Sequence, residues 1–135
     1  MSKKKRIGKK KCIKLARDLY RGDKCDRCGL TKADGVQLQA AHIIPEEDSW
    51  LCCHPLNIMT MCASDHKWGI RSMHKNPLDF AKWFHQKYPV RYAQLLNLSK
   101  RFATESYRRT GTLDGPDWVK VYEILRLEKK LRKKK

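Results

Sequence analysis

The sequence predicts a small α+β domain that is stapled by a structural zinc ion and carries flanking helices and basic tails. Two pairs of metal-binding residue types, Cys25 with Cys28 and Cys62 with Asp65, bracket the middle of the chain. The stretch between the pairs is typical of two short strands, and the flanking stretches repeat apolar residues at helical spacing. A chain of 135 residues is long enough for one domain with a modest core.

Basic residues are concentrated at the two ends of the chain. The formal net charge is +17, and the segments 1–11 and 129–135 are rich in Lys and Arg, whereas every acidic residue lies in 12–128. We therefore take 12–128 as a single domain, 1–11 as a basic N-terminal arm and 129–135 as a basic C-terminal tail. Such ends are typical of disordered, solvated segments, and they also attract phosphate backbones without folding. Nucleic acid is the expected partner.

No membrane association is expected. The N-terminus lacks the apolar segment of a signal peptide, and no run approaches the roughly 20 apolar residues of a membrane span. In a reducing compartment, clustered cysteines favour metal binding over disulfides. We therefore expect a cytoplasmic protein.

In chain order, the first expected element is a helix over 12–20. The segment 22–30, which holds the first cysteine pair, has the Gly-containing polar character of a tight turn. A strand is expected over 36–44, where β-branched and small residues recur. After a loop over 46–54, a second strand is expected to lead into a helix that starts near 62–65.

The second half of the chain is expected to be helical. Pro77 is typical of a first helical turn, so we take 25–77 as the motif-bearing core and 78–128 as the helical C-terminal part. A second helix is expected after Pro89, followed by an irregular segment over 101–115. The last expected element is an amphipathic helix that runs into the Lys-rich end.

The two pairs of metal-binding residues predict a zinc site. Zinc takes four ligands in a tetrahedron, and two half-sites that each give two ligands are a common way to supply them. The expected ligands are the members of the two pairs: Cys25, Cys28, Cys62 and Asp65. A Cys is more usual than an Asp in the fourth place, so three substitutes stay open: Cys52, Cys53 and His66. The alternative is that Cys62 is a buried core thiol and the first pair marks only a turn.

Three further polar residues lie between these half-sites or directly after the second: His42, Asn57 and His66. The phrases AAHIIP and LNIMTMCASDH that contain them resemble the HNH endonucleases, and HKNPLDFAKWF resembles a run found in small phage proteins of that family. The resemblance covers 25–77. It implies a ββα-metal fold, a DNA endonuclease activity and a place inside a phage-infected bacterial cell.

The resemblance also implies a role for each motif residue. His42 would be the general base that takes a proton from the attacking water, Asn57 would brace the hairpin, and His66 would bind a catalytic divalent cation, Mg²⁺ or another. Many family members carry a metal ligand directly before the base, where this chain has Ala41. Either His42 is itself a ligand or another residue completes the site, with four candidates: Glu46, Glu47, Asp48 and His74.

DNA, double-stranded or branched, is the expected substrate, with low sequence specificity. Four residues around the last motif histidine are candidate phosphate contacts: Lys67, Arg71, His74 and Lys75. Monomer and homodimer both stay open. The alternative to an enzyme is a non-catalytic, zinc-bearing nucleic-acid-binding protein that has kept the fold and lost a ligand at Ala41.

Overall fold

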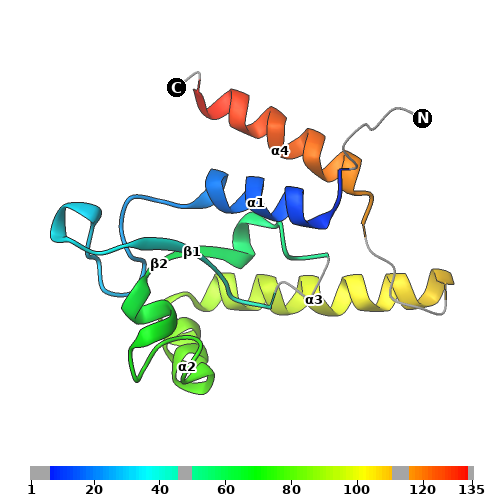
Figure 1. Cartoon of the computed structure of the whole chain (residues 1–135). Helices are drawn as coiled ribbons and strands as arrows, with labels where there is room; N and C mark the ends of the chain where they lie inside the picture. The colour runs from blue at the N-terminus through cyan, green and yellow to red at the C-terminus, as the bar shows by residue number, and fades with distance from the viewer. Residues whose placement is uncertain (1–6, 46–49, 111–115, 134–135) are drawn as a thin grey trace.

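The computed structural model describes residues 7–45, 50–110 and 116–133, with the backbone alone described over 101–110. These residues form helices around a two-stranded antiparallel sheet, which confirms the expected α+β class. Figure 1 shows α1 and α4 on one side of the sheet and α2 and α3 on the other. The main elements are α1 (Lys9–Tyr20), β1 (Leu38–His42), β2 (Ile58–Cys62), α2 (Pro77–Lys87), α3 (Pro89–Thr110) and α4 (Trp118–Lys133). Short helical turns cover Lys32–Asp34, Pro55–Asn57 and Ser64–Trp68.

The register of the sheet sets where the motif residues lie. β1 and β2 pair from Leu38 opposite Cys62 to His42 opposite Ile58. β1 is shorter than the expected strand over 36–44, because beyond His42 the N–H of Ile44 donates to the side chain of Asn57 (2.7 Å). This register brings His42 next to Asn57 at one end of the sheet and leaves Cys62 at the other end.

The two faces of the sheet pack against different helices. β2 is buried along its whole length, so its side chains contribute to the core on both faces. One core cluster joins the strands to α2 and α3 and contains Ala41, Met59, Met61, Met73, Phe80, Phe84 and Leu95. The other joins β2 to α1 and α4 and contains Cys12, Ala16, Ile58 and Leu125. The thin sheet is therefore stabilised from both sides by helices that lie far apart in the sequence.

The C-terminal part is helical as expected, and α3 is longer than expected. α2 begins as predicted at Pro77, after Asn76, whose side chain accepts from the N–H of Asp79 (3.1 Å). α3 continues to Thr110, so the expectation of an irregular segment is wrong for 101–110, while 111–115 lie outside the described residues. The helix persists because 90–110 contains neither Gly nor Pro and several residues of high helix propensity.

Both basic ends take part in the α1–α4 pair. α1 begins at Lys9, inside the segment expected to be an arm, and α4 continues to Lys133, past the expected start of the tail. Arg132 donates to the carbonyl oxygen of Leu19 (3.1 Å), and its guanidinium lies over the ring of Tyr20. These contacts anchor the last turns of α4 on α1. None of the helices that the structure describes is both long and apolar enough to cross a membrane.

Candidate metal centre and active site

The expected zinc ligands lie together. Cys25 and Cys28 come from the turn after α1, Cys62 ends β2, and Asp65 belongs to the turn Ser64–Trp68. Each offers one ligand atom, and these atoms all lie within 4.8 Å of one another. The structure therefore confirms that this set can bind a metal ion such as zinc, with the carboxylate of Asp65 in the place where a fourth Cys is more usual.

The distances within the cluster fit a tetrahedral zinc site. A Zn–S bond of about 2.3 Å and tetrahedral angles place two thiolates about 3.8 Å apart. The Sγ atoms of Cys28 and Cys62 are 3.8 Å apart. The Oδ2 atom of Asp65 is 3.3 Å from Sγ of Cys25 and 3.4 Å from Sγ of Cys62. The donor set is that of a zinc site with three thiolates and one carboxylate.

Local backbone contacts position the first cysteine pair. The N–H of Cys25 donates to Leu30 (2.8 Å), and Gly29, at φ 77°, donates to the carbonyl of Cys25 (2.9 Å) and closes the turn. A positive φ of this size favours glycine, which explains its place directly after the second cysteine. The carboxylate of Asp26 accepts from the N–H of Thr60 (2.8 Å) and thereby ties the turn to β2.

Two sulfur atoms of the cluster accept hydrogen bonds from the backbone. Backbone N–H groups of Cys28 and Asp65 point at the sulfur atoms of Cys25 (3.5 Å) and Cys62 (3.4 Å), an arrangement that stabilises thiolates. Burial raises the pKa of the Cys62 thiol, so that without a cation this group keeps its proton at neutral pH. Metal binding at this cluster must therefore release protons.

The remaining cysteines lie apart from the cluster. Cys12 is buried and donates to the carbonyl of Trp118 (3.3 Å). Cys52 is buried and Cys53 half-buried, with their Sγ atoms 3.8 Å apart. The group of possible ligands among the described residues contains neither of them, nor His66, so the substitutes that the sequence left open are not needed.

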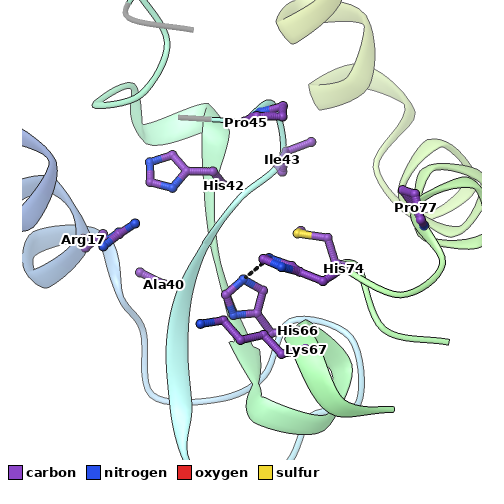
Figure 2. Close-up of a pocket in the computed structure, with 10 residues that line it drawn as sticks. Arg17, Ala40, His42, Ile43, Pro45, His66, Lys67, His74 and Pro77 are labelled. Atoms are coloured by element: carbon purple, nitrogen blue, oxygen red, sulfur yellow. Dashed lines mark hydrogen bonds between the residues drawn. The ribbon is translucent and has the colours of Figure 1, made fainter. Parts of the chain in front are cut away.

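A cavity of about 450 Å³ brings the motif histidines together. Figure 2 shows Arg17 and His42 on one side of β1 and the His66–His74 pair on the other. The lining residues come from α1, β1 and the region from Ser64 to α2: Arg17, Ala40, His42, Ile43, Pro45, His66, Lys67, Met73, His74 and Pro77. Three imidazoles and two cationic side chains thus share one concave site.

His42 is fixed by one of its ring nitrogens. Its Nε2 atom lies 2.7 Å from the carbonyl oxygen of Cys52. A carbonyl only accepts hydrogen bonds, so Nε2 carries a proton and donates in this contact. The imidazole is therefore oriented by the loop after β1.

His66 is fixed in a similar way and faces His74. Its Nδ1 atom lies 2.8 Å from Oε1 of Gln39, an acceptor, so that its Nε2 atom is unprotonated and lies 3.0 Å from Nε2 of His74. Burial lowers the pKa of His66 to about 4, and positive charge acts in the same direction from its neighbours His74, Lys67, Arg17 and His42. At neutral pH His66 is a neutral imidazole whose lone pair points into the cavity.

Asn57 is a bracing residue beside the cavity. It is fully buried, and its side chain makes hydrogen bonds to three backbone groups. It accepts from the N–H of Ile44 (2.7 Å) and donates to the carbonyl oxygens of Ile44 (3.0 Å) and Leu51 (3.1 Å). It therefore ties together the two ends of the loop that carries the carbonyl of Cys52, which in turn orients His42.

Ala41 supplies no ligand, because its side chain is a methyl group. It is fully buried in the core with Met59 and Met73, which explains a small apolar residue at this position. Of the candidates to complete a cation site, His74 lies against His66. The other candidates, Glu46, Glu47 and Asp48, lie outside the described residues.

The four candidate phosphate contacts divide into two pairs. Lys67 and His74 line the cavity, whereas Arg71 and Lys75 do not. Arg71 binds Asp79 through two of its nitrogen atoms, at 3.0 and 3.2 Å. Its guanidinium therefore serves to hold the start of α2.

The sequence reasoning missed Arg17 and Gln39. Arg17 reaches the cavity from α1, and Gln39 from β1 fixes His66. Neither belongs to a recognisable spacing, since Arg17 is one of many basic residues in its segment and Gln39 one of two glutamines in its strand region. Only the three-dimensional arrangement reveals them.

The cavity brings together side chains of two chemical kinds. It combines the imidazoles of His42, His66 and His74, a side chain that can exchange protons or bind a metal, with the cations Arg17 and Lys67. Comparison of the chain with protein-family models, with curated proteins and with solved structures finds no match.

Proposed function

We propose that the protein is a divalent-metal-dependent DNA endonuclease of the HNH type, which hydrolyses phosphodiester bonds with low sequence specificity. The observation that carries the proposal is the cavity that joins an oriented His42 to the His66–His74 pair. The order of β1, β2 and the turn Ser64–Trp68 supports a ββα-metal arrangement, because His42, Asn57 and His66 occur on or beside these elements in the order of the motif.

His42 would act as the general base. Its Nδ1 atom would accept the proton of a water molecule that attacks the phosphorus atom, while Nε2 keeps its proton and donates it in a hydrogen bond to the carbonyl oxygen of Cys52. Asn57 positions this carbonyl through the loop and so acts at a distance from the substrate. An imidazole is suited to this task because its ordinary pKa lies near neutral pH.

His66 and His74 would hold the divalent cation. Two nitrogen ligands at about 2.1 Å from a metal lie roughly 3.0–3.4 Å apart for bond angles between 90° and the tetrahedral angle, and the two Nε2 atoms are 3.0 Å apart. His74 thus offers the ligand that position 41 lacks. A divalent cation bound here would stabilise negative charge on the phosphate and on the leaving oxygen.

The cluster of Cys25, Cys28, Cys62 and Asp65 would have a separate, structural role. It joins the turn after α1 to the end of β2, next to the turn that carries His66. A structural zinc site is closed by four protein ligands, whereas a catalytic site keeps open positions. The closed donor set fits the first kind, and the pair of histidines in an open cavity fits the second.

A second candidate function is non-catalytic, zinc-dependent binding of nucleic acid. The buried Ala41 favours it, because a ligand common at that position in the family is absent. The two functions share the zinc cluster and the cationic residues Arg17 and Lys67. They differ in whether the histidines cleave the phosphodiester backbone of the bound nucleic acid.

The test is incubation of the purified protein with supercoiled, linear and branched DNA in the presence of magnesium, manganese, nickel or zinc. We expect cleavage of at least one DNA form with at least one metal, and a loss of about 10²-fold or more in His42→Ala with the fold retained. His85→Ala, a change at an exposed histidine on α2, is the matched control and should cleave like the wild type. Binding of DNA by folded, zinc-loaded protein without cleavage under any of these conditions would favour the second function.

A further inference from the structure

A second cavity, of about 360 Å³, continues the active-site cavity between α1 and β1. We call it the α1–β1 groove. Four residues line both cavities: Arg17, Ala40, His66 and Lys67. The remaining lining residues of the groove are Lys14, Asp18, Arg21, Gln37, Leu38 and Gln39. A ligand that lies in the groove therefore reaches the histidines without leaving the concave surface.

The groove is strongly cationic. Lys14, Arg17 and Arg21 line it from the α1 side, and Lys67 lines it near His66. The single carboxylate among the lining residues, Asp18, lies 3.8 Å from Arg21, with both side chains about half exposed. An ion pair this exposed is weak, so Arg21 can leave Asp18 and bind another anion at little cost in free energy.

The cations of α1 form a row along one face of the helix. Lys14 and Arg17 are three residues apart, and Arg21 follows four residues later at the C-cap, so the three recur at helical spacing. Another face of α1 carries Cys12 and Ala16, which pack in the core with α4. The row is therefore presented to the groove by the packing of the helix.

We propose that the α1–β1 groove binds the phosphates of one DNA strand and leads that strand into the active-site cavity. The row from position 14 to 21 is about 10 Å long at 1.5 Å per residue, which corresponds to roughly three nucleotides at about 3.4 Å of rise each. Amides of Gln37 and Gln39 line the same groove and add no opposing charge. The inference rests on the proposed function for the identity of its ligand.

This path differs from the one that the motif alone indicates. Arg71 and Lys75 follow the last motif histidine, yet they line neither the cavity nor the groove. Arg71 is held by Asp79 in a two-pronged contact. The strand therefore approaches from the side of α1, over residues that precede the motif in the sequence.

The test compares DNA binding by the full chain and two double variants, with zinc bound and no other divalent cation added. Lys14→Gln with Arg21→Gln removes two cations of the groove. Lys82→Gln with Lys87→Gln removes two exposed cations of α2 and is the matched control. Fluorescence anisotropy with a labelled duplex between about 50 and 200 mM salt gives the slope of log affinity against log salt concentration.

We expect the groove variant to bind more weakly and its slope to become shallower by about 2, because two phosphate contacts are lost at about 0.9 each. The α2 control should keep the slope of the wild type. An unchanged slope in the groove variant, or an equal loss in the control, would overturn the inference. Cleavage by the wild type is measured in parallel. If the wild type cleaves DNA but the groove variant keeps the wild-type slope, the inference fails and the proposed function stands. If the wild type binds DNA through the groove but does not cleave it, only the proposed nuclease activity is refuted.

Discussion

The two motif histidines in the cavity, His42 and His66, are each held by a hydrogen bond through one ring nitrogen. This bond determines what the second nitrogen of the same ring can do. The carbonyl oxygen of Cys52 accepts a hydrogen bond from Nε2 of His42, and the amide oxygen of Gln39 accepts one from Nδ1 of His66. The opposite nitrogens, Nδ1 of His42 and Nε2 of His66, are left as acceptors. The proposed division of roles between base and cation ligand thus rests on two hydrogen-bond acceptors that carry no charge.

Asn57 supports the site indirectly, through hydrogen bonds to the backbone of the loop that orients His42. Asn57→Ala leaves the backbone partners at Ile44 and Leu51 unsatisfied in a buried place, which should lower the free energy of unfolding by about 1–3 kcal/mol. Urea denaturation of the zinc-loaded protein measures the loss. Asn97→Ala, at an exposed position of α3, should change it little. Equal stabilities of the two variants would contradict the bracing role.

Asp65 is the residue that decides the composition of the metal cluster. Asp65→Ala should lower the zinc content below the expected value of about one ion per chain and lower the melting temperature, because three thiols cannot close the site. Asp65→Cys should keep the zinc, since a thiolate suits the same position. Zinc analysis and thermal melts check both, with Glu123→Ala on α4 as the control. Full zinc occupancy in Asp65→Ala would assign the fourth ligand elsewhere.

At the scale of elements, one network of ion pairs holds the turn after α1 against the rest of the domain, beside the cluster of possible metal ligands. Arg27, in that turn, donates to Asp79 of α2 (2.9 Å) and to the carbonyl oxygen of Arg71 (2.6 Å). Arg71 binds the same carboxylate. One carboxylate therefore links the cysteine turn, the segment after the motif and the start of α2.

This link should depend on pH in a defined direction. Hydrogen bonds from Arg71 and Arg27 hold the pKa of Asp79 below its usual range. The carboxylate therefore contributes stability above its unfolded pKa of about 3.9, and the contribution is lost as the pH falls through the lower, folded pKa. The urea midpoint of the wild type should exceed that of Asp79→Asn at about pH 5, and the gap should narrow towards about pH 3. A gap that stays constant or widens on acidification would contradict the link.

The elements show what the sequence can and cannot predict. The starts of α2 and α3 follow from Pro77 and Pro89, whose fixed geometry suits a first helical turn. The length of α3 was underestimated because the polar run after residue 100 lacks an apolar pattern, while intrinsic propensity and the absence of Gly or Pro keep it helical. The sequence predicts that the last helix runs into the Lys-rich end, but not the residue at which α4 ends, because its last turn depends on contacts of Arg132 with α1, far away in the sequence.

At the scale of the whole molecule, the cluster of possible zinc ligands was predictable and the cationic surface was not. The spacing of Cys25, Cys28, Cys62 and Asp65 follows a recognisable chemical pattern, and the fold brings the set together. The α1–β1 groove has no such pattern, because Lys and Arg also occur throughout the segment between the two basic ends and their positions in space depend on helix packing. Net charge predicts a polyanionic partner without saying where it binds.

The most direct test of the account is the cleavage rate of supercoiled DNA as a function of divalent cation concentration, for the wild type, His42→Ala and His74→Ala. We expect His42→Ala to lower the rate by about 10²-fold or more at saturating cation, because it removes the base. His74→Ala should instead raise the cation concentration required for half the maximal rate, because it removes a proposed ligand beside His66. A wild-type chain that is folded and zinc-loaded yet leaves the DNA intact at every cation concentration, or a His42→Ala variant that cleaves at the wild-type rate, would contradict the account.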